Sequence, residues 1–119
     1  MGITINNNIE KDNVAEITVT TMNEDEAYKL CVKADALRLA NMFQESIPKY
    51  LRSIFNKRDN ADAYYGLALS YKALKNYDKA IETLEKALSC VQDDFSIYYE
   101  LGICHLLNGT PSPAIKCLI

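Results

Sequence analysis

The only histidine of the chain follows a cysteine directly, as Cys104 and His105. A Cys–His pair can serve as a nucleophile with its base, and both residue types bind Zn²⁺. Cys117 lies about one helical hairpin further on. Adjacent residues of an α-helix point about 100° apart, so Cys104 and His105 cannot easily face one ligand atom. We therefore expect His105 to be a half-buried packing residue, and we predict no catalytic residue, metal site or cofactor.

Two further kinds of active site are not indicated. Asp78, Glu82 and Glu85 fall on the outward face of a predicted helix, not in a cleft. The chain has only four glycines, which are widely separated, so it contains no glycine-rich phosphate-binding loop. We predict that the protein is not an enzyme, and the question becomes what its structural elements present to a partner.

From residue 23 onward, apolar residues recur at the spacing of amphipathic helices. Asn23 and Asn60 are predicted to cap helices, and Gly109 is predicted to end one in the left-handed conformation. Pro48 predicts a late start or a kink in its helix. The predicted helices cover residues 23–41, 43–57, 61–75, 77–91 and 95–108, and a last one begins after Thr110. The predicted apolar face of the helix 43–57 consists of Ile47, Leu51, Ile54 and Phe55.

The pattern repeats at an offset of 34 residues. In the first helix of each period, Tyr64, Leu67 and Ala68 align with Tyr98, Leu101 and Gly102. In the second, Ala80, Ile81 and Leu84 align with Ala114, Ile115 and Leu118. Residues 27–60 fit the same frame more weakly. One hairpin cannot bury both its faces, so the hairpins must stack, with small residues allowing close approach.

These residues resemble the tetratricopeptide repeat family, most closely in "AYYGLALSYKALKNYDKAIETLEKAL". The resemblance covers repeats at about 27–60, 61–94 and 95–119, the last incomplete, and departs from the family at Lys33, Ser46 and Ser53. It implies an all-α superhelix of about three helical hairpins over residues 23–119. The leader, residues 1–22, is predicted to be irregular or to form short strands, either flexible or docked.

Composition and charge limit the function classes. The chain has 119 residues, enough for one compact domain, and a net charge of −3, which disfavours a dedicated nucleic-acid binder. No apolar run approaches the length of a membrane span, and "MGITINNNIEKD" does not resemble a signal peptide. The four cysteines form no CxxC pair, and we expect reduced thiols in a cytoplasmic protein.

In the family, the first helix of each hairpin lines a concave face. The residues expected on this face are Tyr28, Cys31, Asp35 and Arg38, then Asp62, Tyr65, Leu69 and Lys72, then Ser96, Tyr99, Ile103 and Leu106. Eight of them are predicted to bind a partner: Tyr28, Arg38, Tyr65, Leu69, Lys72, Tyr99, Ile103 and Leu106. The alternative is that some of these tyrosines only pack against neighbouring helices. The family's Lys and Asn clamp for a C-terminal carboxylate is absent, since the matching positions are Cys31, Asp35, Gly66, Ser96 and Glu100.

The sequence therefore predicts a protein–protein interaction module, an adaptor, scaffold or chaperone-like domain that holds a peptide or helix in its concave groove. One alternative is self-assembly, including a homodimer, through an apolar C-terminal end formed by Leu107, Ile115, Leu118 and Ile119. Another is a regulatory domain of a larger protein. We also consider that the acidic leader docks on the first hairpin, where residues 27–60 hold seven basic and three acidic residues.

Overall fold

The computed structural model describes residues 23–109, and every regular element in this range is an α-helix. Residues 23–39 form the first helical stretch. It is followed by α2 (Phe43–Asn56), α3 (Ala61–Ala73), α4 (Tyr77–Cys90) and α5 (Phe95–Asn108). These bounds confirm the all-α prediction. The predicted leader strands and the helix after Thr110 lie outside the described residues.

Polar residues at the helix ends explain several of these bounds. The Asn60 side chain accepts a hydrogen bond from the Ala63 backbone N–H at 3.2 Å, which confirms the predicted cap of α3. Asp94 caps α5 by accepting from the N–H groups of Ser96 and Ile97. Gly109 has a φ of 74° and ends α5 as predicted. Asn23 is itself helical, so the cap predicted there is wrong, because a capping residue has non-helical backbone angles.

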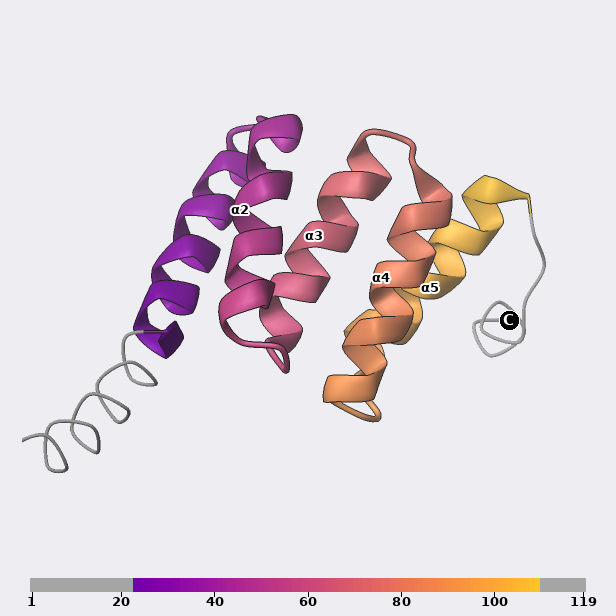
Figure 1. Ribbon diagram of the computed structural model, residues 1–119. Helices are drawn as coiled ribbons and strands as arrows, with labels where there is room; N and C mark the ends of the chain where they lie inside the picture. Colours follow the sequence, from indigo (N-terminus) through magenta and orange to yellow (C-terminus); the bar gives the residue numbers. More distant parts are fainter. Residues whose placement is uncertain (1–22, 110–119) are drawn as a thin grey trace, which may run out of the picture.

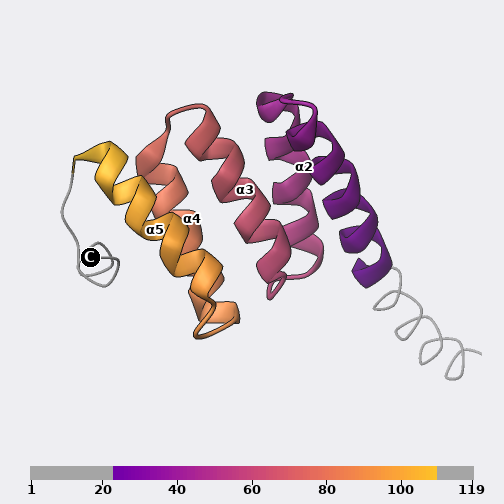
Figure 2. The same ribbon diagram turned by 180° about the vertical axis from the view of Figure 1, so that it is seen from behind.

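The helices are arranged as stacked antiparallel hairpins (Figure 1). We call residues 23–39, α3 and α5 the A helices, and α2 and α4 the B helices. Figure 2 shows residues 23–39 and α5 in front of α2 and α4. Each hairpin thus contributes one helix to each of two layers, as expected for a helical repeat.

Two clusters of buried residues hold the stack together. The first joins residues 23–39, α2 and α3, through Cys31, Ala34, Tyr50, Ile54, Ala63 and Leu67. The second joins α3, α4 and α5, through Ala68, Ala80, Leu84, Ala87, Ile97, Leu101 and Cys104. Tyr64 and Tyr71 pack against both clusters. The apolar stripes of α3 and α4 therefore pack on each other and on both flanking elements, as the repeat predicts.

The first hairpin corrects one expectation about α2. Leu51 is 47% exposed and Phe55 is 73% exposed, although both were predicted on the packing face. The predicted Ile54 is buried and Ile47 packs against the core, but the other buried residues are Ser46, Tyr50 and Ser53. The two serines can be buried because their hydroxyls are hydrogen-bonded, Ser53 to the Ala27 carbonyl at 2.6 Å and Ser46 to the Ser70 hydroxyl at 2.8 Å. In addition, α2 begins at Phe43, five residues before Pro48, so it does not start late.

Candidate functional site

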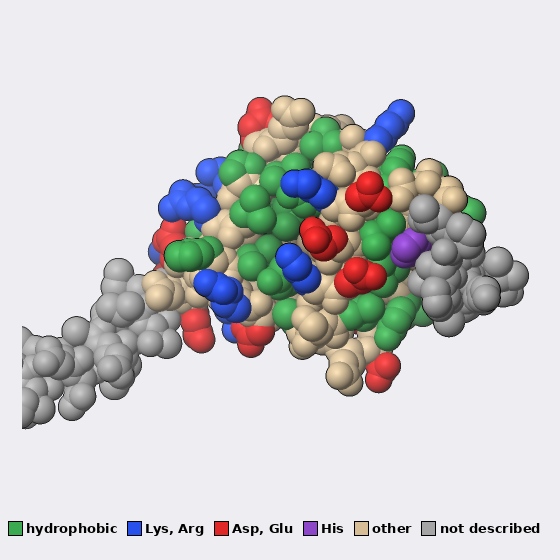
Figure 3. All heavy atoms as spheres, turned by 45° about the vertical axis from the view of Figure 1, so that its right-hand side comes forward, with side chains coloured by type: hydrophobic (Ala, Val, Ile, Leu, Met, Phe, Trp, Pro, Cys, Tyr) green, Lys and Arg blue, Asp and Glu red, His purple; other side chains and the backbone are tan. Residues whose placement is uncertain are grey.

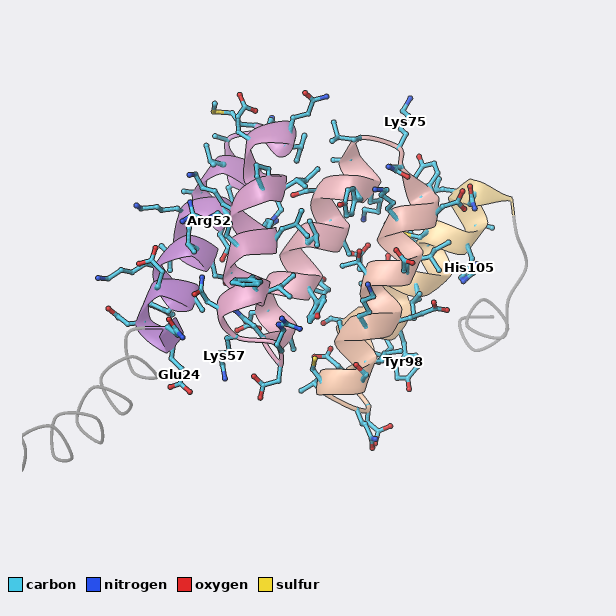
Figure 4. The ribbon with its side chains drawn as sticks, viewed as in Figure 1. Glu24, Arg52, Lys57, Lys75, Tyr98 and His105 are labelled. Carbon is cyan, nitrogen blue, oxygen red and sulfur yellow. The ribbon has the colours of Figure 1, made fainter. Side chains whose placement is uncertain are left out.

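The A-helix face contains a cavity of about 420 Å³ between residues 23–39 and α3. Six residues of the first helix line it: Glu24, Tyr28, Cys31, Val32, Asp35 and Arg38. The loop before α3 contributes Lys57 and Asn60, and α3 itself contributes Asp62, Tyr65 and Gly66. In Figure 4, Glu24 and Lys57 extend from the same end of the first hairpin, so the mouth of the cavity carries charges of both signs.

A second cavity, of about 220 Å³, lies between the amino-terminal parts of α3 and α5. Its lining consists of Ala61, Asp62, Tyr65, Asp94, Ser96 and Ile97. Asp62 and Tyr65 line both cavities. The two cavities are therefore neighbours on one face, and we call them together the A-helix groove.

Two residues that line the larger cavity, Asp35 and Arg38, take part in a polar contact that crosses the layers. Tyr50 of α2 is fully buried, and its hydroxyl donates to Asp35 Oδ1 and accepts from Arg38 Nε at 2.9 Å. Arg38 Nη2 lies 3.5 Å from the same Asp35 oxygen. Burial, followed by the hydrogen bond to Asp35, raises the pKa of Tyr50, so its hydroxyl keeps its proton. The triad connects residues 23–39 to α2 and positions two of the side chains that line the cavity.

Gly66 makes this arrangement possible. The ring and hydroxyl of Tyr50 occupy the space where a Cβ would lie at residue 66, so no larger residue fits without displacing the tyrosine. Here the requirement for glycine comes from close approach, since Gly66 lies inside the helix α3.

An ion pair links the next two A helices. Lys72 Nζ of α3 lies 2.6 Å from Glu100 Oε1 of α5, and both side chains are largely shielded from solvent. Partly buried pairs of this geometry are stronger than exposed ones. Lys72 therefore already has a partner within the chain.

Comparisons with known proteins agree with this architecture. Residues 61–93 match the family model described as the tetratricopeptide repeat. The small glutamine-rich tetratricopeptide repeat-containing protein 2 of Saccharomyces cerevisiae is 28% identical over 114 residues, which is 90% of this chain and 32% of that protein. The solved structure of MamA superposes with a TM-score of 0.72 at 30% identity, covering 76% of this chain and 53% of that chain.

Residues 61–93 thus form a tetratricopeptide repeat, and the fold of the described residues resembles that of tetratricopeptide repeat proteins. A further solved structure, described as YrrB, a TPR protein with an unusual peptide-binding site, has a TM-score of 0.72 at 23% identity and supports the fold alone. It covers 84% of this chain and 52% of YrrB. The chain thus spans between a third and about half of the length of these relatives. Tetratricopeptide repeats are generally interaction modules without a catalytic role.

The predicted binding residues fall into two groups, according to whether they line a cavity. Tyr28, Arg38 and Tyr65 line the larger cavity, together with Cys31, Asp35 and Asp62. The other five lie outside both cavities. Leu69, Lys72 and Ile103 are half-buried, whereas Tyr99 and Leu106 are exposed. Tyr99 stacks on Phe95, with ring centroids 6.3 Å apart. The cavities therefore lie toward the first repeat and the amino-terminal ends of α3 and α5.

Sequence reasoning missed several residues of the groove. Glu24 continues the stripe of Tyr28, Cys31, Asp35 and Arg38 by one turn, so the helical spacing could have identified it. Lys57 and Asn60 precede α3, where no periodicity applies. Tyr50 belongs to the opposite layer and lines neither cavity, but it contacts the lining residues Asp35, Arg38 and Gly66.

Two of the cysteines, Cys31 and Cys104, are buried and unreactive. Burial raises the pKa of Cys104 to about 11, and burial together with Asp35 and Asp62 raises the pKa of Cys31 to about 11. Both thiols stay protonated near neutral pH, so neither is an activated nucleophile. His105 is half-buried beside the buried Cys104, as expected. Among residues 23–109, no group of three or more His, Cys, Asp and Glu side chains could hold a metal ion.

None of the helices among the described residues has the length and apolar character needed to cross a bilayer.

Proposed function

We propose that this tetratricopeptide domain is an adaptor or chaperone-like module that holds a peptide segment of a protein partner in the A-helix groove. The observation that carries this proposal is the cavity of about 420 Å³ between residues 23–39 and α3, lined by the 69% exposed Tyr28 and the half-buried Tyr65. Tyrosines give large contact area at little entropic cost and keep a hydroxyl for hydrogen bonding, which suits them to such interfaces.

The groove is also held in shape before any ligand arrives. The triad of Tyr50, Asp35 and Arg38 joins the layers, and Lys72 with Glu100 joins α3 to α5. A preformed site binds more tightly because less conformational entropy is lost on binding. The name given to the YrrB structure shows that a neighbour of this fold has a peptide-binding site, which is consistent with the proposal.

The test is selection of peptides from a random display library against the whole chain, followed by binding measurements on the enriched peptides. Tyr65→Ala and Tyr28→Ala should each weaken binding by about 1 to 2 kcal/mol, which corresponds to roughly five- to thirtyfold in Kd. Phe55→Ala is the matched control, because Phe55 is an exposed aromatic residue of the B helix α2 outside both cavities. Failure to enrich any peptide, or equal effects of the three variants, contradicts the proposal.

A second candidate function is self-association through the carboxyl-terminal end of α5. It is favoured by the exposure of Leu106 (65%) and Leu107 (54%), which form an apolar patch on that helix end. Ile115, Leu118 and Ile119, predicted to extend the patch, lie outside the described residues. In light scattering, the molecular mass should rise with protein concentration. In the Leu107→Glu variant it should stay at the monomer value.

The cysteines bear on where the domain works. Cys31, Cys90 and Cys104 are free thiols, and the first and last are buried. We propose a reducing compartment such as the cytoplasm, because thiols of this kind persist there without oxidation.

A further inference from the structure

We infer that the A-helix groove selects peptides that carry a lysine or arginine next to an apolar anchor, with Asp62 as the partner of the cation. This inference rests on the proposed peptide-binding function and names the chemistry of the ligand. It is carried by the balance of charges around the two cavities and by the place of Asp62 between them.

Acidic side chains outnumber basic ones in the groove. Glu24, Asp35, Asp62 and Asp94 line one cavity or the other, against only Arg38 and Lys57. Both bases are already paired. Arg38 contacts Asp35 and Tyr50, and Lys57 Nζ lies 3.0 Å from Asp59 Oδ1. The positive charges are thus compensated within the chain, and an excess of negative charge remains for a ligand.

The carboxylates of the groove differ in how far they are engaged. Asp35 accepts from Tyr50 and Arg38, and Asp94 caps α5. Asp62 is exposed in the first turn of α3, and within residues 23–109 no hydrogen bond or ion pair engages its carboxylate. It can therefore pair with a ligand cation without breaking an existing contact.

The surroundings of Asp62 place a cation beside an aromatic ring. Asp62 and Tyr65 are three residues apart on α3, so their side chains share one face of the helix, and both line the two cavities. An apolar anchor held near Tyr28 in the larger cavity leaves the neighbouring ligand side chain close to Asp62. A lysine or arginine there gains both a carboxylate partner and the face of Tyr65.

Burial is the main cause of the raised pKa values of the neighbouring Tyr65 and Cys31, and nearby carboxylates raise both further. Burial raises the pKa of Tyr65, and Glu100 raises it further. Cys31, on the opposite wall, is affected by burial, Asp35 and Asp62, which together raise its pKa to about 11. The face shown in Figure 3 has no such excess of one charge, because acidic and basic side chains are intermingled on it. We therefore expect a preference for positively charged ligands at the groove and not at that face.

The experiment uses the whole chain and three pools of short fluorescein-labelled peptides. All pools have leucine and phenylalanine at the same positions, and lysine, glutamine or glutamate at the remaining ones. By fluorescence anisotropy, the lysine pool should bind about tenfold more tightly than the glutamate pool, with the glutamine pool between them. This ratio should fall as salt is added, since part of the pair is exposed to solvent.

Variants assign the preference to Asp62. Asp62→Asn should reduce the lysine-to-glutamate ratio to about twofold, and Asp62→Lys should reverse it. Glu85→Gln is the matched control, since it removes the same charge from an exposed position of α4 and should leave the ratio unchanged. Circular dichroism of each variant checks that the helices remain intact.

The outcomes separate this inference from the proposed function. If no pool binds, the peptide-binding function itself is contradicted. If all pools bind equally and Tyr65→Ala weakens all of them, the groove binds peptides but the preference for cations is wrong. If the lysine preference survives in Asp62→Asn or is lost in Glu85→Gln, the attraction does not come from Asp62 and its role is overturned.

Discussion

The two interfaces of the stack differ in chemistry. Where α2 meets residues 23–39 and α3, buried hydrogen bonds accompany the apolar cluster: Ser46 bonds to Ser70, Ser53 to the Ala27 carbonyl, and Tyr50 to Asp35 and Arg38. Where α4 meets α3 and α5, the core consists of apolar residues such as Leu84, Ala87 and Leu101. The larger cavity adjoins the polar interface.

This difference shows that close helix packing requires small side chains but not apolar ones. Ser46, Ser53 and Ser70 are as fully buried as Ala80 and Ala87, because every buried polar side-chain atom among the described residues has a hydrogen-bond partner. A hydrogen-bonded interface contributes less transfer free energy than an apolar one, but it defines side-chain positions more narrowly. That property suits the interface that supports a binding groove.

The largest effect is expected in the apolar interface. Leu84 is completely buried in the cluster between α3, α4 and α5. Leu84→Ala should lower the free energy of unfolding by about 3 kcal/mol, because it removes apolar contacts and leaves a cavity. Urea unfolding followed by circular dichroism measures this loss. A loss below about 1 kcal/mol would show that this interface is not the main source of stability.

A smaller effect is expected where the polar interface is most tightly packed. Gly66→Ala places a methyl group in the space of the Tyr50 ring and should cost about 2 kcal/mol. The double variant with Tyr50→Leu should recover part of this loss, because the shorter side chain clears the site. Independent, additive effects of the two substitutions would contradict the contact.

The hydroxyl of Tyr50 is expected to contribute about 1 to 2 kcal/mol, since Tyr50→Phe leaves Asp35 and Arg38 with one partner fewer. The hydroxyl should also make the free energy of unfolding depend on pH. The folded-state pKa of Tyr50 is raised, so its stabilisation is complete below about pH 10, the ordinary pKa of tyrosine, and is lost as the pH rises further. Between wild type and Tyr50→Phe, the stability difference should therefore shrink at alkaline pH. A constant difference would contradict the assignment.

The smallest effect tests the serine pair. Ser46→Ala should cost about 1 kcal/mol, because it leaves the buried Ser70 hydroxyl without this partner. Ser70→Ala should cost less, because the Ser46 hydroxyl still donates to the Phe43 carbonyl. The double variant should cost less than the sum of the two single losses, since no unpaired hydroxyl remains. It would also make this contact apolar, like those between α3, α4 and α5. Additive losses in the double-mutant cycle would show that the hydroxyls do not act as a pair.

The local features of the helices could be predicted from the sequence because they depend on neighbouring residues. Asn60 caps α3 and Gly109 ends α5, as their residue types indicate. The face of α2 could not be predicted in the same way. Ile54 is buried as predicted, but Leu51 and Phe55 are exposed. Ser46 and Ser53 are buried through hydrogen-bond partners that lie 24 and 26 residues away in the chain.

In the candidate site, too, local features could be predicted from the sequence and contacts between distant residues could not. Helical spacing and the repeat offset indicated Tyr28, Arg38 and Tyr65, which line the larger cavity. The pairing of Lys72 with Glu100, and of Arg38 with Tyr50, joins residues that are 28 and 12 positions apart. No local pattern marks such pairs, so sequence reasoning treated Lys72 and Arg38 as free to bind a partner.

The sequence by itself determined the helices, their repeat and their assignment to layers, because helical periodicity and capping act over only a few residues. Only the tertiary structure decided which polar groups satisfy one another, where the cavities lie, and which charges remain unpaired around Asp62. Those properties depend on contacts between distant residues, whose distances are set by the packing of whole helices.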